Sequence, residues 1–152
     1  MQTRIGKPTG YALHVGVDRV SYEKLDTLFT AENDAKVLTA LTRGRGFKDE
    51  DTLVLLGKDA TREAFRKALD DFSEKAIAGD LFVFTFSGHG GKVRDKDGDE
   101  ITDGKDEVLC LYDQKVIDDE LKVWINKFKK GVRIVAIIDC CFSEGVISDI
   151  FR

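Results

Sequence analysis

The 152-residue chain contains one proline, three cysteines and no long hydrophobic run. A membrane helix needs about 20 consecutive apolar residues, and because no segment approaches that length, we expect no membrane insertion. The N-terminal residues likewise lack the apolar stretch of a secretion signal. The cysteines are Cys110, Cys140 and Cys141. An odd count that includes two adjacent cysteines argues against a disulfide framework and favours the reducing cytoplasm.

An excess of positive charge is also absent. Lysine and arginine total 24 against 28 aspartate and glutamate residues, a net charge of -4, so neither nucleic acid nor an anionic membrane is an expected partner. The hydrophobic fraction of 42% is enough for a globular core. Since no repeat or low-complexity segment interrupts the chain, we expect residues 1–152 to form a single domain.

Short apolar runs alternate with amphipathic segments along the chain. The runs predict strands at residues 11–17, 52–56, 81–86 and 132–138. Helical spacing predicts helices at residues 31–41, 61–72 and 117–128, and Ala31, Ala35, Leu38 and Leu41 share one face of the first. Near-continuous apolar strands separated by helices are typical of an α/β fold with a mainly parallel sheet covered on both faces. Residues 88–107 are predicted to form a long loop, and long loops are often functional.

Reactive side chains follow two of these strands. Ser87-Gly-His-Gly-Gly91 comes after strand 81–86, and Asp139-Cys140-Cys141 ends strand 132–138. In an open α/β sheet, ligands bind beyond the carboxyl ends of the strands. If the two strands are neighbours, the His89 imidazole could take the proton of the Cys141 or Cys140 thiol and return it to a leaving amine. The amide of Gly90 is a candidate to hold a developing oxyanion. This chemistry is acyl transfer to sulfur, hence peptide hydrolysis.

The same residue types also have common roles outside catalysis. A cysteine at a strand end is often a small buried hydrophobe, and a glycine-rich pentapeptide is often a turn. His14 and Cys110 lie within apolar runs, so we expect both to pack in the core. No Cys-x-x-Cys or His-x-x-x-His spacing indicates zinc, and no organic cofactor is expected. The alternatives to an enzyme are a non-proteolytic domain that binds partners and a small α/β binding domain with structural cysteines.

Several separated motifs resemble those of metacaspases, in consistent order from about Tyr11 to about Asp149. They are Ala31-Glu-Asn-Asp-Ala35, Ser87-Gly-His-Gly-Gly91, Asp97-Gly-Asp-Glu, Asp103-Gly-Lys-Asp-Glu-Val-Leu, Ile117-Asp-Asp-Glu-Leu121 and Asp139-Cys-Cys-Phe-Ser143. The resemblance implies the catalytic large-subunit region of a caspase-like, three-layer α/β/α sandwich with strand order 2-1-3-4. An apolar strand edge would stay open after strand 132–138, so we expect a separate C-terminal part to complete the sheet.

The resemblance also assigns roles to single residues. It selects Cys141 as the nucleophile and His89 as its general base, with Cys140 as a neighbour. Metacaspases cleave after arginine or lysine, and the acidic substrate pocket of the family maps onto Asp34, Ser87 and Asp139. A guanidinium in a concave site pairs well with carboxylates, so the expected substrates are peptides or proteins with basic residues.

Calcium and self-processing are further expectations from the resemblance. The calcium aspartates of the family map onto Asp106, Asp118, Asp119 and Asp149, and hard oxygen ligands suit Ca²⁺. The alternative for Asp118 is a cap on the helix that begins there. An enzyme that cuts after arginine could itself generate an end at Arg152, which would leave a C-terminal small subunit of the same precursor as partner. The alternative is that Arg152 is an arbitrary boundary.

Overall fold

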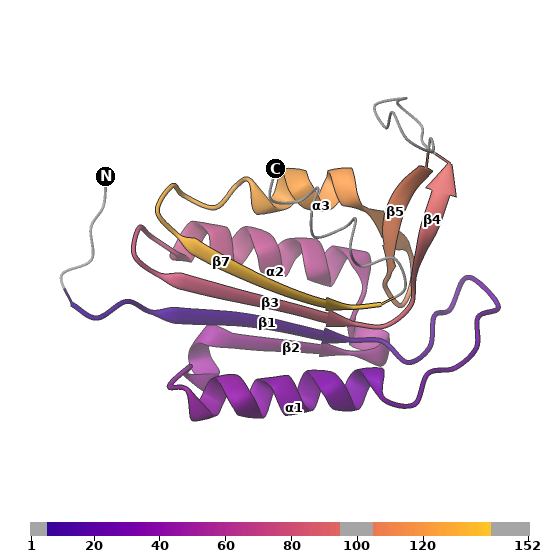
Figure 1. Ribbon diagram of the computed structural model, residues 1–152, viewed down its shortest axis with the longest axis horizontal. Helices are drawn as coiled ribbons and strands as arrows, with labels where there is room; N and C mark the ends of the chain where they lie inside the picture. Colours follow the sequence, from indigo (N-terminus) through magenta and orange to yellow (C-terminus); the bar gives the residue numbers. More distant parts are fainter. Residues whose placement is uncertain (1–5, 95–104, 141–152) are drawn as a thin grey trace.

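A computed structural model describes residues 6–94 and 105–140. Its main sheet has four strands, all parallel, in the order β2-β1-β3-β7 (Figure 1). The strands are β1 (Gly10–Gly16), β2 (Thr52–Leu56), β3 (Leu81–Ser87) and β7 (Arg133–Asp139). The predicted strands and the predicted order 2-1-3-4 are therefore confirmed, with each strand end within one residue of its expected position.

Helices cover both faces of this sheet. Helix α1 (Ala31–Gly44) lies on one face, and α2 (Arg62–Lys75) and α3 (Asp118–Ile125) lie on the other (Figure 1). As predicted, α2 begins after Thr61, whose side chain accepts a hydrogen bond from the amide of Ala64 at 3.1 Å. Helix α3 is shorter than predicted. Within the described residues, none of the helices combines the length and apolarity needed to cross a membrane.

The core between the sheet and helices α2 and α3 is mainly aromatic. Phe82, Phe84 and Phe86 point to this side of β3, because alternate strand residues face the same way, and each is at most 1% exposed. The Phe65 ring of α2 lies 5.5 Å from that of Phe84 and 6.0 Å from that of Trp124 in α3. These contacts pack both helices against β3, the strand that leads to His89.

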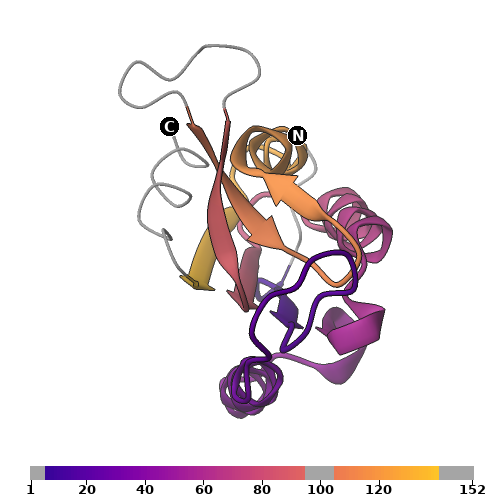
Figure 2. The ribbon, with the colours of Figure 1, turned by 90° about the vertical axis from the view of Figure 1, so that its right-hand side faces the viewer.

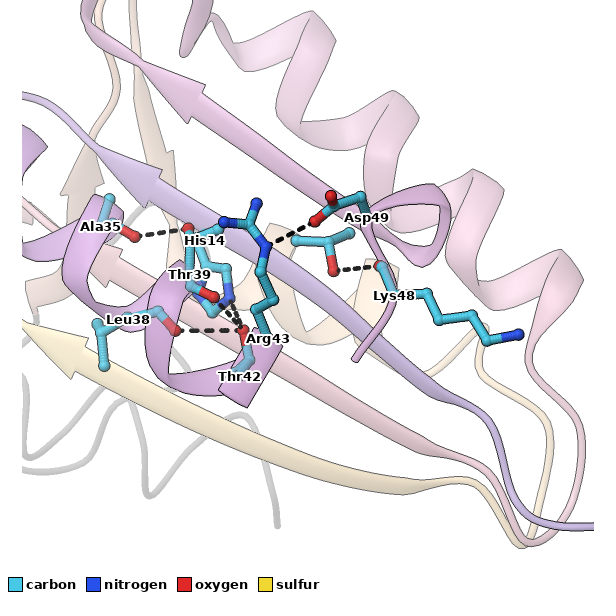
Figure 3. A network of polar contacts seen from close by, with 9 residues as sticks. His14, Ala35, Leu38, Thr39, Thr42, Arg43, Lys48 and Asp49 are labelled. Atoms are coloured by element: carbon cyan, nitrogen blue, oxygen red, sulfur yellow. Dashed lines mark hydrogen bonds and ion pairs between the residues drawn. The ribbon is translucent and has the colours of Figure 1, made fainter. Parts of the chain in front are cut away.

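The opposite face of the sheet carries a buried polar network under α1 (Figure 3). His14 of β1 is fully buried, with Nδ1 2.8 Å from Thr85 Oγ1 and Nε2 3.0 Å from Thr42 Oγ1. The Thr42 hydroxyl donates to the carbonyls of Leu38 and Thr39, so its oxygen accepts from His14 Nε2–H, and Nδ1 accepts from Thr85. Burial lowers the pKa of His14 to about 4. The predicted core role of His14 is confirmed.

The small residues of α1 determine which part of its apolar face is buried. Ala31 and Ala35 are buried, but Leu41 is 57% exposed. The first turn of α1 lies directly on Gly16, where an added Cβ would be only 2.5 Å from the Ala31 carbonyl oxygen. The helix therefore docks along its alanines, and Leu41 falls to the flank of that contact.

A second, smaller sheet occupies part of the predicted loop. Residues 88–107 were expected to lack regular structure, but β4 (Gly90–Arg94) and β5 (Lys105–Cys110) pair as antiparallel strands. Strand β6 (Lys115–Ile117), also not predicted, pairs antiparallel with β5 (Figure 2). The sequence pattern did not predict these strands, because β4 begins with two glycines and β5 begins with three charged residues, which are residue types uncommon in strands.

Candidate active site

Three of the predicted site residues meet at the carboxyl end of the main sheet. Ser87, the last residue of β3, is the register partner of Asp139, the last residue of β7. The Ser87 hydroxyl also donates a hydrogen bond to Asp34 Oδ2 of α1 at 3.3 Å. Side chains of paired residues in adjacent parallel strands point the same way, so Asp139 lies on the same face as Ser87 and Asp34. The structure thus groups the predicted pocket residues from three separate elements.

The position of Asp34 depends on how α1 begins. Thr30 precedes the helix but makes no side-chain cap. Asp18, which follows β1, supplies the missing acceptor: its Oδ1 accepts from the amides of Ala31 at 2.9 Å and Glu32 at 3.3 Å. A cap from 13 residues upstream leaves no local sequence signature, so Asp18 was missed by sequence reasoning.

His89 is held at both its side chain and its backbone. Its Nε2 lies 2.6 Å from the carbonyl oxygen of Asp26, and its own carbonyl accepts from the amide of Cys110 at 2.9 Å. A carbonyl can only accept, so Nε2 carries the proton and a neutral ring leaves Nδ1 as the proton acceptor. The side chain is half-buried and keeps access to solvent. Asp26 was also missed, because a backbone acceptor is independent of residue type.

The amide of Gly90 points away from β5. The bond from the Cys110 amide to the His89 carbonyl makes the next pair, Gly90 and Leu109, a non-hydrogen-bonded pair of the antiparallel ladder. The Gly90 N–H is therefore not used by β5. An N–H group that β5 does not use suits the oxyanion role expected for Gly90, which directly follows His89 in the sequence.

Strand β7 leads directly to the two adjacent cysteines. Cys140 is half-buried and packs against the core. Cys141, Asp149 and Arg152 lie outside the described residues, so the pairing of Cys141 with His89 stays a prediction. Cys110 is 2% exposed, as expected for a packed residue.

Two of the predicted calcium ligands are buried acids. Asp106 of β5 is 2% exposed, and Asp118 at the start of α3 is 5% exposed. Burial first, and then the negative charges of Asp119 and Asp106, raise the pKa of Asp118 to about 6. Asp118 Oδ1 is buried without a hydrogen-bond partner among the described residues. In residues 6–94 and 105–140, no group of three or more His, Cys, Asp or Glu side chains is arranged to hold a metal ion.

Asp118 fulfils only part of the alternative role of a helix cap. Ile117 is the N-cap residue of α3, and Asp118 is the first residue of the helix. The Asp118 carboxylate still accepts hydrogen bonds from the backbone of the first turn, which lower its pKa. The Asp118 carboxylate therefore serves the helix and also has a buried oxygen without a hydrogen-bond partner among the described residues.

Known proteins resemble the chain over most of its length. The family model for the metacaspase, peptidase C14 domain matches residues 11–150. Metacaspase-3 of Arabidopsis thaliana is 37% identical over 127 residues, covering 76% of this chain and 35% of the relative. Metacaspase-1A of Neurospora crassa is 33% identical over 167 residues, covering 93% of this chain and 36% of the relative.

Solved structures share the fold. A protein from Geobacter sulfurreducens superposes with a TM-score of 0.79 at 37% identity, covering 88% of this chain and 51% of that one. The structure of pro-sf-caspase-1 gives a TM-score of 0.63 at 17% identity, covering 89% of this chain and 46% of that one. The chain spans about a third of the length of the curated relatives and about half of these structures. The family match, together with the caspase-like sheet and the grouped site residues, shows that the chain belongs to the metacaspase family of peptidase C14.

Proposed function

We propose that the protein is a cysteine endopeptidase that cleaves after arginine or lysine through a dyad of Cys141 and His89. One observation carries this proposal: β3 and β7 are paired in register up to Ser87 and Asp139, so the chain leaves two adjacent strands toward His89 and toward Cys141. The family match supports a peptidase of the cysteine type.

The proposed reaction begins with His89 Nδ1, the nitrogen that accepts a proton in the Nε2–H tautomer, which the bond to the Asp26 carbonyl favours. It takes the thiol proton of Cys141, and the thiolate forms a sulfur–carbon bond to the substrate carbonyl. The amides of Gly90 and Cys141 hold the oxyanion. The carbon–nitrogen bond then breaks as His89 gives the proton to the amine, and water hydrolyses the thioester with His89 as base.

Preference for a basic residue follows from the group of Asp34, Ser87 and Asp139. Two carboxylates and a hydroxyl on one face match the planar donors of a guanidinium, and can also pair with an ammonium. The substrates we infer are therefore peptides or proteins with arginine or lysine before the cleaved bond.

Hydrolysis of short peptides ending in arginine, lysine or aspartate tests this proposal. The complete protein should cleave after arginine and lysine, and Cys141→Ala should abolish cleavage. Asp34→Asn should lower the kcat/KM for arginine peptides by about 10- to 100-fold, because it removes one charge partner of the guanidinium. Cleavage after aspartate alone would contradict the assigned pocket.

Alkylation of the thiols separates the enzyme from a partner-binding domain without enzymatic activity. One fast-reacting thiol at Cys141 that slows in His89→Gln supports the dyad. Cys110, which is buried and whose pKa burial raises, serves as the slow internal reference. Uniformly slow thiols would support the partner-binding alternative instead.

We also propose that a C-terminal small subunit of the same precursor completes the main sheet, after self-cleavage following a basic residue. Among the described strands, β7 stands at the edge of the sheet, and its Val135 and Ile137 are each 45% exposed. Exposed β-branched residues on an edge strand favour a further covering layer. Intact mass decides the processing step: if a Cys141→Ala precursor is cut at the same position as the wild type, self-cleavage is wrong.

For calcium, we propose that Asp106, Asp118 and Asp119 bind the ion together with Asp149 from outside the described residues, because the three described acids by themselves do not form a group that could hold a metal ion. The buried Asp118 oxygen without a partner and the mutual repulsion of the acids fit a hard divalent cation. Calcium would supply positive charge there. Calorimetric titration with CaCl₂ should show binding that Asp118→Asn weakens and Asp113→Asn leaves unchanged. Equal binding by both variants would argue against this site.

A further inference from the structure

The orientation of His89 depends on a surface loop. The acceptor of its Nε2–H is the carbonyl of Asp26, in the segment between β1 and α1 that we call the β1–α1 loop (residues 17–30). Most side chains of this loop are exposed, and Phe29 is 87% exposed. The loop therefore has little core of its own, and specific polar contacts must fix the position of residue 26.

Those contacts run to the β5–β6 hairpin. The Tyr112 carbonyl accepts from both the amide of Ser21 at 2.7 Å and its hydroxyl at 3.0 Å. The Lys115 ammonium lies 2.9 Å and 3.1 Å from the two carboxylate oxygens of Glu23. At the base of the loop, the amide of Leu28 donates to the Asp18 carbonyl at 2.9 Å. The Glu23–Lys115 pair is the contact nearest in sequence to Asp26 that links the loop to the hairpin.

The same hairpin also fixes the backbone of His89. Lys115 is the register partner of Cys110, and the Cys110 amide donates to the His89 carbonyl. The imidazole is held through Asp26, Glu23 and Lys115, and the main chain is held through Cys110. The imidazole and the backbone of His89 are thus both connected to the β5–β6 hairpin, through two separate sets of contacts.

We propose that Glu23 and Lys115 are positioning residues: their ion pair holds the β1–α1 loop so that the Asp26 carbonyl keeps His89 in the Nε2–H tautomer. The inference rests on the proposed function for its effect on catalysis, but its effect on the imidazole can be measured without any substrate. A misplaced carbonyl would release the ring to rotate and to exchange tautomers, which lowers the fraction ready to accept the thiol proton.

The experiment uses the complete protein with four variants. Lys115→Gln removes the pair, Lys115→Glu replaces it by repulsion, and Glu23→Lys combined with Lys115→Glu restores it in reverse. Lys24→Gln is the matched control, since Lys24 is an exposed lysine of the same loop that forms no ion pair among the described residues. Melting temperatures identify any variant that does not fold.

Nitrogen chemical shifts of the His89 ring give the first readout, assigned by loss of the signals in His89→Gln. The wild type and Lys24→Gln should show the Nε2–H tautomer, and Lys115→Glu should show a mixture that the charge-swapped double variant reverses. The second readout is kinetic. Lys115→Gln should lower kcat about two- to fivefold with little change in KM, as expected of one half-exposed ion pair acting on position alone.

The outcomes separate this inference from the proposed function. A tautomer shift in a protein that cleaves no peptide supports the positioning role and contradicts the peptidase. Normal cleavage with an unchanged His89 tautomer in folded Lys115→Gln and Lys115→Glu overturns the positioning role and leaves the peptidase standing. If Lys115→Glu does not fold, Lys115→Gln alone decides between these results.

Discussion

At the scale of single residues, the two histidines of the chain illustrate opposite environments. His14 is enclosed between β1 and α1, with both ring nitrogens bonded to threonine hydroxyls. His89 is half-buried and bonded at one nitrogen to a carbonyl. The sequence correctly placed His14 in the core, because His14 interrupts an apolar run, whereas the role of His89, which follows such a run between glycines, stays a prediction. The sequence could not supply their partners, since hydroxyls and carbonyls from distant elements leave no pattern nearby.

We predict that His14 makes the fold sensitive to acid. Its pKa is lowered to about 4 in the folded protein, whereas the unfolded chain binds a proton near the ordinary value of about 6.5. The unfolded state therefore takes up more protons between these values, and the free energy of unfolding falls as the pH drops through this window. The loss should approach, and not exceed, about 3 kcal/mol at the acid end.

Urea denaturation at pH 7, 5.5 and 4 measures this effect. In His14→Gln, the part of the pH dependence that belongs to the imidazole should disappear, although the variant is less stable at pH 7. His89→Gln is the matched control and should keep the dependence of the wild type. Parallel curves for the wild type and His14→Gln would rule out His14 as the source.

At the scale of elements, the four strands of the main sheet could be predicted because buried parallel strands are continuous apolar runs, whereas the order in which they pair was implied by the family resemblance. The β4–β5–β6 sheet could not be predicted, since glycines and charged residues dominate β4 and the start of β5. The closeness of Asp34 to Ser87 was implied only by the family resemblance. What establishes it physically is the docking of α1 on Gly16 and its remote cap, Asp18.

Removing that cap should affect stability and specificity together. Asp18→Ala should lower the free energy of unfolding by about 1 kcal/mol, because the amides of Ala31 and Glu32 lose their acceptor. It should also reduce the preference for arginine over neutral peptides, because Asp34 lies in the first turn of the loosened helix. Thr30→Ala is the control and should change neither property, since Thr30 provides no side-chain cap. Chemical denaturation and the ratio of kcat/KM values measure the two effects.

An equal loss of stability in Thr30→Ala would show that the local residue caps the helix after all. A stability loss in Asp18→Ala with unchanged selectivity would mean that Asp34 keeps its place without the cap.

At the scale of the whole molecule, the two faces of the sheet are covered unequally. Helices α2 and α3 cover the side with the aromatic core, whereas α1 covers the other side over β2, β1 and β3 (Figure 1). Ile137 is the register partner of Thr85, which bonds to His14 beneath α1. Ile137 and Val135 therefore lie on the α1 side, beyond the reach of that helix, and this accounts for their exposure.

We expect Ile137→Lys to destabilise the complete protein by about 2 kcal/mol, because a further layer from the C-terminal part would bury this side chain. Val123, which is 61% exposed on α3, provides the control, and Val123→Lys should change stability little. Thermal unfolding of both variants makes the comparison. Equal, small effects would indicate that the α1 side of β7 stays open to solvent.

The bond from His89 to the carbonyl of Asp26 has a consequence for mutational tolerance. A main-chain oxygen is present whatever the side chain, so nearly every substitution at position 26 should leave the imidazole oriented. An insertion or deletion in residues 19–28 would instead shift the oxygen itself. The orienting group of the proposed base is thus protected against substitutions at position 26 itself and vulnerable to changes in loop length.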